Sequence, residues 1–554
     1  MIKLRLAKNQ TKQISYYFLL CLLYLLLSFI SVYHFTKNGE LAIKELVDAP
    51  FHLERVRGLA TIWQGPISFN NFFHYGNPVN LFYPWLTMYP LFLLYQITGH
   101  LISSYYLFFI ALTFITAWLC YYVAIKMTNS RLIAIIFSFI YVLAPYRQTN
   151  ILFRHAVGEA IAMTFLPLLI YGLYKIMQAQ QKSAWVLLAV SLAAIAYTHI
   201  LSLVMCSIFI VVFVVIACLQ KQIKKTHLWQ YSQSVIWSIL LAVGALGPIV
   251  SYHFIQTINP PQKQKLVEQA LKPFELLAAT INNQLGTRQY TIGLMIFISL
   301  IFIFVSWRKL TKFEQTLVYA GLVFLVASTT LLPWFYLQST LGMLQFPWRF
   351  MSIATICLAY VGSVAFVKVL LARQWSATKI IIVPLCIGLV LQGAVISNFQ
   401  PRNAEYKTHL FTDQNIKQAV RTKFNGEADY MNIKAYPYLK FYKQQQIISG
   451  TKKLKTTANY QAKAVTYTVV SPKKAYGSLP VLYNPGIKIY NNGHQIKGQQ
   501  NQRGGYNILL QKGKNQIQVK STYPTFMKIE YLVSIIALIG LIIYVWWQRP
   551  KKAS

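Results

Sequence analysis

Long apolar stretches without a charged side chain constrain this sequence more than any other feature. Ile102–Ala124 and Ala184–Leu219 are both of this kind. A helix of about 20 apolar residues crosses the hydrocarbon core of a bilayer. Hydrophobic residues make up 56% of the chain and charged residues 12%, about half the charged share of a soluble domain. The composition therefore excludes a disordered chain, a collagen, a coiled coil and a single soluble domain, and it indicates a multi-span membrane protein.

The placement of the basic residues predicts how the chain crosses the membrane. The 52 Lys and Arg residues outnumber the 13 Asp and Glu residues, and basic clusters alternate with the apolar runs, as cytoplasmic loops do. The first apolar run ends at about Tyr33 and lacks a small-residue cleavage site, so we expect an uncleaved first helix with a cytoplasmic N-terminus. We expect about twelve transmembrane helices with both termini in the cytoplasm. The first ends near residue 33, and the others lie near 102–124, 132–145, 159–175, 184–197, 199–219, 232–254, 291–307, 316–332, 350–371, 380–397 and 528–547.

The segment 34–100 is expected to be a long first external loop. Its apolar part, 81–99, contains Pro84 and Pro90 and is rich in Tyr and Trp, which favours juxtamembrane helices at the outer surface over a span. Counting this part as a span would place Lys126 and Arg131 outside, against the positive-inside rule.

Residues 399–525 differ in composition from the rest of the chain. They hold 20 Lys and Arg residues and four Asp and Glu residues, and Gly486–Gly493 predicts a β-hairpin with an Asn-Gly turn. We therefore predict a transmembrane domain over 1–398, an extracytoplasmic β-rich, sandwich-like domain over 399–525, and a last transmembrane helix with a basic tail over 526–554.

Acidic residues are scarce on the predicted outer face, and two of them stand beside histidines and arginines. Asp48 is followed by His52 and Arg55, and Glu159 follows Arg154 and His155 where a span begins. An ionisable group at the membrane boundary is costly and is therefore a candidate for function. The structural alternatives are that Asp48 caps a helix begun by proline and that Glu159 pairs with Arg154.

Arginines beside aromatic residues supply the other part of a candidate site. Arg147, Arg154 and Arg349 are expected on the outer face, where guanidinium groups can hold a phosphate while a carboxylate accepts a proton from a hydroxyl group. Alternatively, Arg349 anchors the start of a span by snorkelling, and His199 is a satisfied polar group at a tight turn between two spans.

The order of these motifs resembles a known group of membrane enzymes. Asp48 in an Asp-x-x-Phe-His-x-x-Arg context is followed by Gly76-Asn-Pro78, Phe82-Tyr-Pro84, a Tyr146-Arg147…Gly158-Glu159 loop and Gln345-Phe-Pro-Trp-Arg349. From about 10 to 545 the chain resembles the GT-C superfamily of polyprenyl-phosphate-sugar glycosyltransferases, and more closely the bacterial YfhO-type membrane proteins, also labelled 6-pyruvoyl-tetrahydropterin synthase-related. The segment Gly426-Glu-Ala-Asp429-Tyr-Met is similar to the family's Glu-Tyr-Leu-Pro segment but lacks the Leu-Pro, so no role is carried over to it.

The resemblance implies an activity and roles for these residues. Asp48 matches the catalytic acid, which would activate an acceptor hydroxyl for inverting attack on C1 of a sugar linked to undecaprenyl phosphate, and Glu159 matches a second acidic position that would orient the acceptor or Arg154. No cofactor and no metal are expected. The residues expected to bind substrate are His52, Arg55, Tyr146, Arg147, Arg154, His155, His199, Gln345 and Arg349.

The resemblance also implies partners and a location. We expect membrane lipids, undecaprenyl-phosphate-sugar as donor, and an anionic cell-wall polymer such as teichoic acid as acceptor. A polyprenyl-phosphate glycosyltransferase and a flippase would supply the donor, and nucleic acid is not an expected partner. The site would face the outside of a bacterial cell membrane.

Other function classes remain open. A transporter or flippase for lipid-linked sugars or wall polymers predicts broken helices and polar residues near the middle of the membrane, whereas the predicted span centres carry almost no charge. A non-catalytic envelope-assembly protein would tolerate replacement of Asp48. Pterin-synthase chemistry would require zinc-binding histidines, including a His-x-His pair, which the sequence lacks; the six cysteines lie in apolar stretches without metal-ligand spacing.

Overall fold

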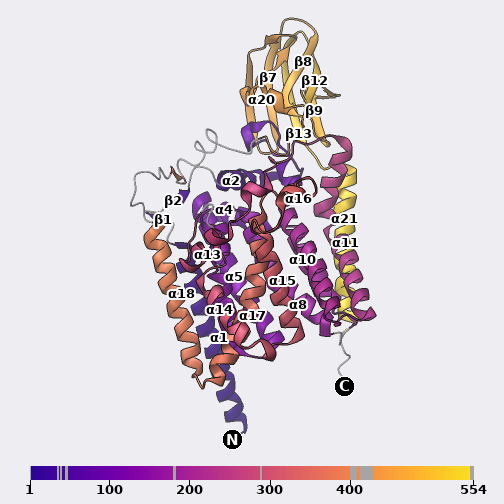
Figure 1. Cartoon of the computed structure of the whole chain (residues 1–554). Helices are drawn as coiled ribbons and strands as arrows, with labels where there is room; N and C mark the ends of the chain where they lie inside the picture. The colour runs from indigo at the N-terminus through magenta and orange to yellow at the C-terminus, as the bar shows by residue number, and fades with distance from the viewer. Residues whose placement is uncertain are drawn as a thin grey trace.

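The computed structural model describes residues 2–33, 36–37, 40–43, 48–178, 182–286, 290–399, 409–411, 413 and 428–548. Most of 400–427, at the start of the predicted outer domain, and the basic tail beyond 548 lie outside these residues. The long helices run side by side as one bundle, and two β-sheets stand at one end of it (Figure 1). Helices α1 and α21 have their terminal ends at the opposite end of the bundle.

Each of the twelve predicted spans contains a helix, although some of their ends, such as 291–293 and 328–332, are not helical. Eight helices of the described chain are long and apolar enough to cross a membrane, and α6 with α7 gives a ninth span if this pair, bent by 46°, is counted as one. Three further helices, α9, α14 and α15, are shorter. The bounds are α1 Ile2–Tyr33, α5 Leu101–Thr128, α6 Arg131–Val142, α7 Pro145–Leu152, α8 Val157–Gln178, α9 Trp185–Ala196, α10 Ile200–Leu219, α11 Lys225–Ile255, α14 Leu294–Val305, α15 Lys312–Ala327, α17 Met351–Ala372, α18 Ala377–Phe399 and α21 Thr525–Trp547.

Most of the short helices lie at the end of the bundle that carries the sheets. In the first loop, 34–100, none of them reaches the length of a span, as the prolines in 81–99 predict. Others follow α11 and α15, η7 and α20 precede the sheets, and η4 joins α14 to α15 at the opposite end of the bundle. The bounds are α2 Ala49–Arg57, η1 Gly58–Thr61, η2 Phe72–His74, α3 Val79–Phe82, η3 Leu86–Met88, α4 Tyr89–Thr98, α12 Leu266–Gln269, α13 Pro273–Ile281, η4 Trp307–Lys309, α16 Trp334–Leu341, η5 Gly342–Leu344, η6 Pro347–Phe350, η7 Tyr436–Tyr438 and α20 Leu439–Gln444.

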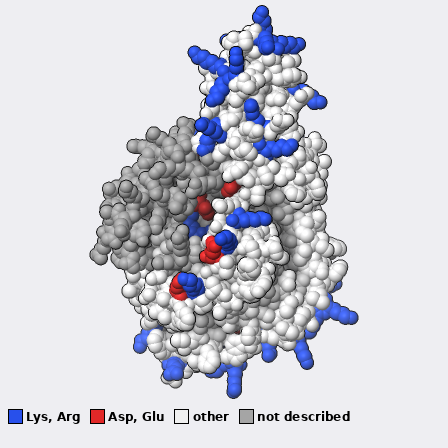
Figure 2. All heavy atoms as spheres, turned by 45° about the horizontal axis from the view of Figure 1, so that its top comes forward, with Lys and Arg blue, Asp and Glu red and all other residues white. Residues whose placement is uncertain are grey.

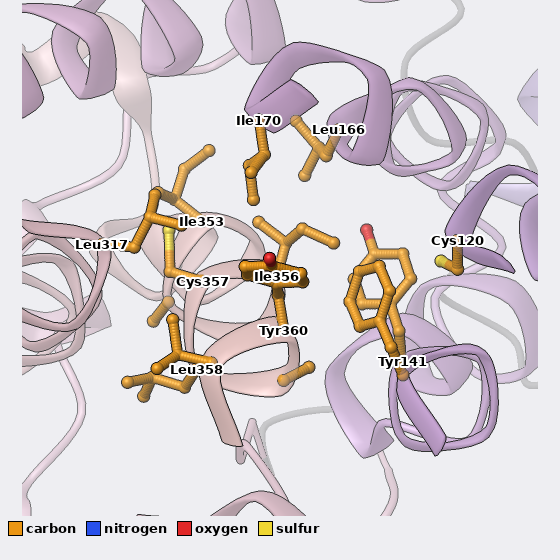
Figure 3. Packing of buried hydrophobic residues seen from close by; sticks show 14 of the residues in the cluster. Cys120, Tyr141, Leu166, Ile170, Leu317, Ile353, Ile356, Cys357, Leu358 and Tyr360 are labelled. Carbon is orange, nitrogen blue, oxygen red and sulfur yellow. The ribbon is translucent and has the colours of Figure 1, made fainter. Parts of the chain in front are cut away.

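Helix α17 is the core of the bundle. In the span that it forms with η6, 83% of the most apolar window is buried, and its sequence is apolar on all sides, as a fully enclosed helix requires. Gly362 lets α14 approach closely, because a Cβ there would lie 2.2 Å from the Ser299 hydroxyl. Figure 3 shows the tight packing around α17, with Ile353, Ile356, Cys357 and Tyr360 against Leu166, Ile170, Leu317 and Tyr141.

The C-terminal strands form two antiparallel five-stranded sheets. Their orders are β10-β9-β13-β7-β6 and β11-β12-β8-β4-β5. The predicted hairpin is confirmed: β9 and β10 pair at Asn491 and His494, and Asn492 and Gly493 both have positive φ, as a two-residue Asn-Gly turn requires. The bounds are β4 Ile448–Ser449, β5 Lys452–Lys453, β6 Thr456–Gln461, β7 Ala464–Ser471, β8 Ala475–Leu482, β9 Ile487–Asn491, β10 His494–Ile496, β11 Gln499–Gln500, β12 Gly505–Leu510 and β13 Gly513–Ser521.

The first external loop fixes these sheets to the bundle. The Ile67 amide donates to Ser521 Oγ at 3.1 Å, and Asn484 Nδ2 donates to the Gly76 carbonyl at 2.9 Å. A small third sheet joins the same loop to a later segment through β1 Thr36–Lys37, β2 Glu40–Ile43 and β3 His409–Phe411. The structure thus has the predicted fold class: a mainly helical multi-span membrane protein with antiparallel sheets near its C-terminus.

Candidate functional site

Asp48 occupies the N-cap position of α2, but its side chain makes no capping hydrogen bond. Its backbone amide donates to the Arg154 carbonyl at 3.1 Å, which places the start of α2 against the loop after α7. The side chain reaches solvent, yet the surrounding protein removes enough water to raise the pKa of the carboxyl group, against the lowering effect of the Arg154 and Arg349 charges. The capping alternative is therefore not realised, and the carboxylate is left for another use.

Glu159 is the centre of a buried network in the first turn of α8. Its Oε1 accepts from the Tyr146 hydroxyl at 2.5 Å and from Asn150 Nδ2 at 3.3 Å. Its Oε2 accepts from Arg154 Nη1 at 2.9 Å and lies 3.6 Å from Arg349 Nε. The pairing of Glu159 with Arg154 is confirmed. Because one carboxylate faces two guanidinium groups, the cluster keeps one positive charge in excess.

Aromatic rings and carbonyl oxygens hold the two arginines in place. The Arg154 guanidinium lies 4.2 Å from the centre of the Trp348 ring, and that ring stacks on Tyr290 at 4.0 Å. Arg349 Nη1 donates to the Leu344 carbonyl at 3.0 Å and to Gln345 Oε1 at 3.1 Å. Arg349 is only 8% exposed, so it turns into the protein instead of snorkelling outward.

Three buried histidines, His52, His155 and His199, lie near the arginine cluster. The rings of His52 and His199 lie 5.4 Å and 5.5 Å from that of Tyr83, and His155 Nδ1 lies 3.1 Å from the Tyr105 hydroxyl. Burial lowers the pKa of His155 and of His199 to about 3, and burial also lowers that of His52. These rings are therefore neutral at physiological pH and add no charge to the arginine cluster.

Two of the expected substrate-binding arginines point away from this cluster. Arg55 is fully buried, donates to Asn80 and to the carbonyls of Tyr83 and Pro84, and stacks 4.0 Å from the Tyr83 ring. It holds the first external loop together. Arg147 donates to the hydroxyl of Thr116 at 2.9 Å, inside the helix bundle.

A further carboxyl group, that of Asp429, lies close enough to Asp48 to feel its charge, although the sequence analysis assigned it no role. Burial raises the pKa of Asp429 to about 6, with a further contribution from the charge of Asp48. Its segment is fixed by Asn259, which exchanges backbone hydrogen bonds with Tyr430 and Met431. The similarity of this segment to a family motif was the only sequence signal for it, because more than 380 residues separate it from Asp48.

The site lies at the end of the bundle that carries the sheets. Figure 2 shows a few acidic side chains beside basic ones on this face of the bundle, and many basic side chains on the sheets. Among the described residues, no group of three or more His, Cys, Asp or Glu side chains is arranged to hold a metal ion. The site therefore offers one exposed carboxylate, that of Asp48, near two buried arginines that aromatic rings hold in place.

Comparison with solved structures finds a likeness to ArnT. The crystal structure of ArnT from Cupriavidus metallidurans bound to undecaprenyl phosphate is similar over 64% of this chain and 60% of that chain, with 11% sequence identity and a TM-score of 0.42. The likeness therefore spans less than two thirds of that protein. No curated protein matches the chain in sequence.

Comparison with sequence families gives a broader match. The family described as the 6-pyruvoyl-tetrahydropterin synthase related domain, a membrane protein family, matches residues 81–399. This range contains Glu159, both arginines of the cluster and most of the helix bundle, and it covers more than half of the chain. The chain belongs to the 6-pyruvoyl-tetrahydropterin synthase related family of membrane proteins.

Proposed function

We propose that the protein is a membrane glycosyltransferase of the GT-C type that takes a sugar from undecaprenyl phosphate and transfers it to an acceptor outside the cytoplasm. One observation carries this proposal: Asp48, whose carboxylate does not cap its helix, stands beside an arginine cluster with an excess positive charge. A base and a phosphate-binding group side by side are what such a displacement needs.

The reaction follows from this arrangement. The acceptor hydroxyl attacks C1 of the sugar, and its proton passes to the Asp48 carboxylate. The bond between C1 and the phosphate oxygen breaks, and the lipid phosphate leaves with the electron pair. Arg154 and Arg349 hold the leaving phosphate, because planar guanidinium groups donate paired hydrogen bonds to phosphate oxygens.

The raised pKa of Asp48 suits this role. A carboxylate that water stabilises poorly is a stronger base than a solvated one, so it takes up a proton more readily in the transition state. Glu159 already accepts hydrogen bonds at both oxygens, and it serves to orient the arginines. Tyr146 orients Glu159 in turn, and His52, His155 and His199 line the space for the sugar as neutral partners.

The acceptor that fits the outer surface is an anionic wall polymer such as teichoic acid. Between Ala428 and Pro524 the chain has 15 Lys and Arg residues and one acidic residue, Asp429. A surface of this kind attracts polyanions through its electric field. In this proposal the sheets face outward, both termini lie in the cytoplasm, and a polyprenyl-phosphate glycosyltransferase and a flippase supply the donor.

The test uses the full-length protein in proteoliposomes with undecaprenyl-phosphate sugars and wall-polymer acceptors. Asp48→Asn keeps the size of the side chain and removes the base, so transfer should fall about 100-fold or more. Glu268→Gln, which alters an exposed acid paired with Lys265, should transfer at the wild-type rate. Wild-type transfer by Asp48→Asn would refute the assignment of the base.

A flippase for lipid-linked sugars is the second candidate, because α6 and α7 are two apolar helices bent by 46° at a short break, and broken helices are common in transporters. This function requires no base at Asp48. Lipid scrambling that persists in Asp48→Asn, with no sugar transfer by the wild type, would favour it.

A further inference from the structure

The open face of one C-terminal sheet is a surface to which the proposed function gives no detailed role. In the sheet β10-β9-β13-β7-β6, side chains alternate between the core and solvent along β13 and β7, so one face packs inside and the other meets water. In the other sheet, Gly477–Leu482 of the central strand β8 are all buried, and α20 packs against this strand. The first sheet therefore presents the broader open face.

A polar row of amide, hydroxyl and phenol side chains crosses this face. The strand register places Gln518 of β13 opposite Thr466 of β7 and opposite Tyr490 of β9. Asn459 of β6 extends the row at one end, and Gln495 of β10 extends it at the other. Five strands about 4.8 Å apart give a row about 19 Å long. Side chains of these kinds offer both donors and acceptors to the hydroxyl groups of a polyol or sugar.

Two lysines beside the polar row form a pair of like charges. Lys488 of β9 and Lys520 of β13 are exposed and lie directly opposite each other. The Lys520 ammonium nitrogen lies 5.2 Å from the centre of the Tyr490 ring, so it leans toward the polar row. Like charges in such a pair destabilise a sheet, and the sequence has no acidic residue between 430 and 524 to neutralise them. The pair therefore suits an anionic group held between the two ammonium groups.

The lysine pair lies at the end of the sheet that faces the first external loop. Ser521 follows Lys520 directly and accepts from the Ile67 amide of that loop. The same loop carries Asp48 at the start of α2. Lys514 is exposed at the far end of β13, so a chain that lies along this strand runs from Lys514 toward the loop of the proposed site.

We propose that this face binds a polyol-phosphate chain along β13, with one phosphate between Lys488 and Lys520 and the chain hydroxyl groups on the polar row. This proposal rests on the proposed function and assigns the surface that holds the polymer acceptor away from its reacting hydroxyl group. The phosphate supplies the missing negative charge through charge-assisted hydrogen bonds. The bound chain raises the local concentration of acceptor hydroxyl groups near Asp48.

Binding is measured with the full-length protein in nanodiscs and a poly(glycerol phosphate) chain. Lys488→Gln with Lys520→Gln should lower the affinity about tenfold, because two exposed charge contacts are lost. Lys452→Gln with Lys453→Gln removes the same charge from β5, the edge strand of the other sheet, and should bind within about twofold of the wild type. Equal losses in the two double variants would show that net charge alone sets the affinity and would overturn the proposal.

Gln518→Val tests the polar row, because valine suits a strand but its side chain makes no hydrogen bond. This change should weaken binding of poly(glycerol phosphate) about fivefold. It should leave unchanged the binding of inorganic polyphosphate, which carries the charge without hydroxyl groups. Unchanged binding of poly(glycerol phosphate) by Gln518→Val overturns the proposal. Equal affinity of the wild type for the two polymers would identify an unselective basic surface and overturns it too.

Transfer kinetics separate this surface from the proposed function. With poly(glycerol phosphate) and single glycerol phosphate as alternative acceptors, the wild type should have the lower KM for the polymer. Lys488→Gln with Lys520→Gln should lose this preference, because the contacts of the chain away from its reacting hydroxyl group are removed. A preference that persists in this double variant overturns the proposal. Selective polymer binding without any transfer by the wild type would support the surface and count against the proposed function alone.

Discussion

Glu159→Gln is the substitution that tests the arginine cluster most directly, because it removes one charge and almost no volume. In the wild type the Glu159 carboxylate is 2% exposed and faces Arg154 at 2.9 Å and Arg349 at 3.6 Å. Removing one partner of a buried ion pair costs about 3–5 kcal/mol, since the remaining charge stays buried. The glutamine keeps an oxygen that can accept from Tyr146, so we expect a loss of about 3 kcal/mol, the lower end of this range.

The measurement is equilibrium unfolding in mixed micelles, followed by tryptophan fluorescence, since Trp348 stacks on the cluster. A second variant, Glu159→Gln with Arg154→Gln, restores the charge balance and should recover about half of the lost stability. Glu275→Gln is the control, because its partner Lys272 lies 2.8 Å away but both side chains are about 70% exposed; it should leave stability unchanged. A loss below about 1 kcal/mol in Glu159→Gln would refute the role of Glu159 as the buried counter-ion.

Three further outcomes are expected. The pKa of Asp429 is raised to about 6 in the folded protein, above the unfolded value of about 3.9, so the folded state holds the proton more tightly and stability falls as the pH rises from about 4 to about 6. The thermal unfolding temperature of Asp429→Asn should not show this fall. A variant with the same pH profile as the wild type would contradict the prediction. Raising the salt concentration from about 0.05 to 0.5 M should weaken binding of an anionic wall polymer, because screening shortens the range of the basic surface field; a salt-independent affinity in sedimentation assays would exclude that surface as the binding site. Gly172→Val should lower the thermal unfolding temperature, because a Cβ at this position would lie 2.8 Å from the backbone of Leu188, whereas Gly393→Val should not.

The fold followed from patterns that act over short distances in the sequence. Apolar runs and basic flanks predicted the helices of the bundle, because they reflect the lipid and water around those residues. Asn492-Gly493 predicted the β9–β10 hairpin, because this pair favours the backbone conformation of a two-residue turn. The bend between α6 and α7 was not predicted. Ala144-Pro145 marks it in the sequence, but proline is also tolerated inside spans such as α8, which contains Pro167.

The sequence predicted which residues belong to the candidate site better than it predicted how their side chains are arranged. Sequence position placed the arginines and acids near the outer surface, yet the direction of each side chain depends on tertiary packing. Arg55 turns toward carbonyl oxygens of its own loop and Arg147 toward hydroxyl groups of the bundle, while Arg154 and Arg349 converge on Glu159. Asp429 could not be placed, because only the folded chain brings it within reach of the charge of Asp48.

The hydrogen bond between Ile67 and Ser521 joins residues 454 positions apart, and this separation has a consequence for biogenesis. Asp48 enters the membrane environment early in synthesis, but the strand that anchors its loop emerges only after almost all spans have been inserted. This contact therefore forms late, as contacts of high sequence separation do. A chain that ends before β13 would keep most of its helices, and the contact of Asp48 with Arg154, but would lose this attachment of the sheets to the loop.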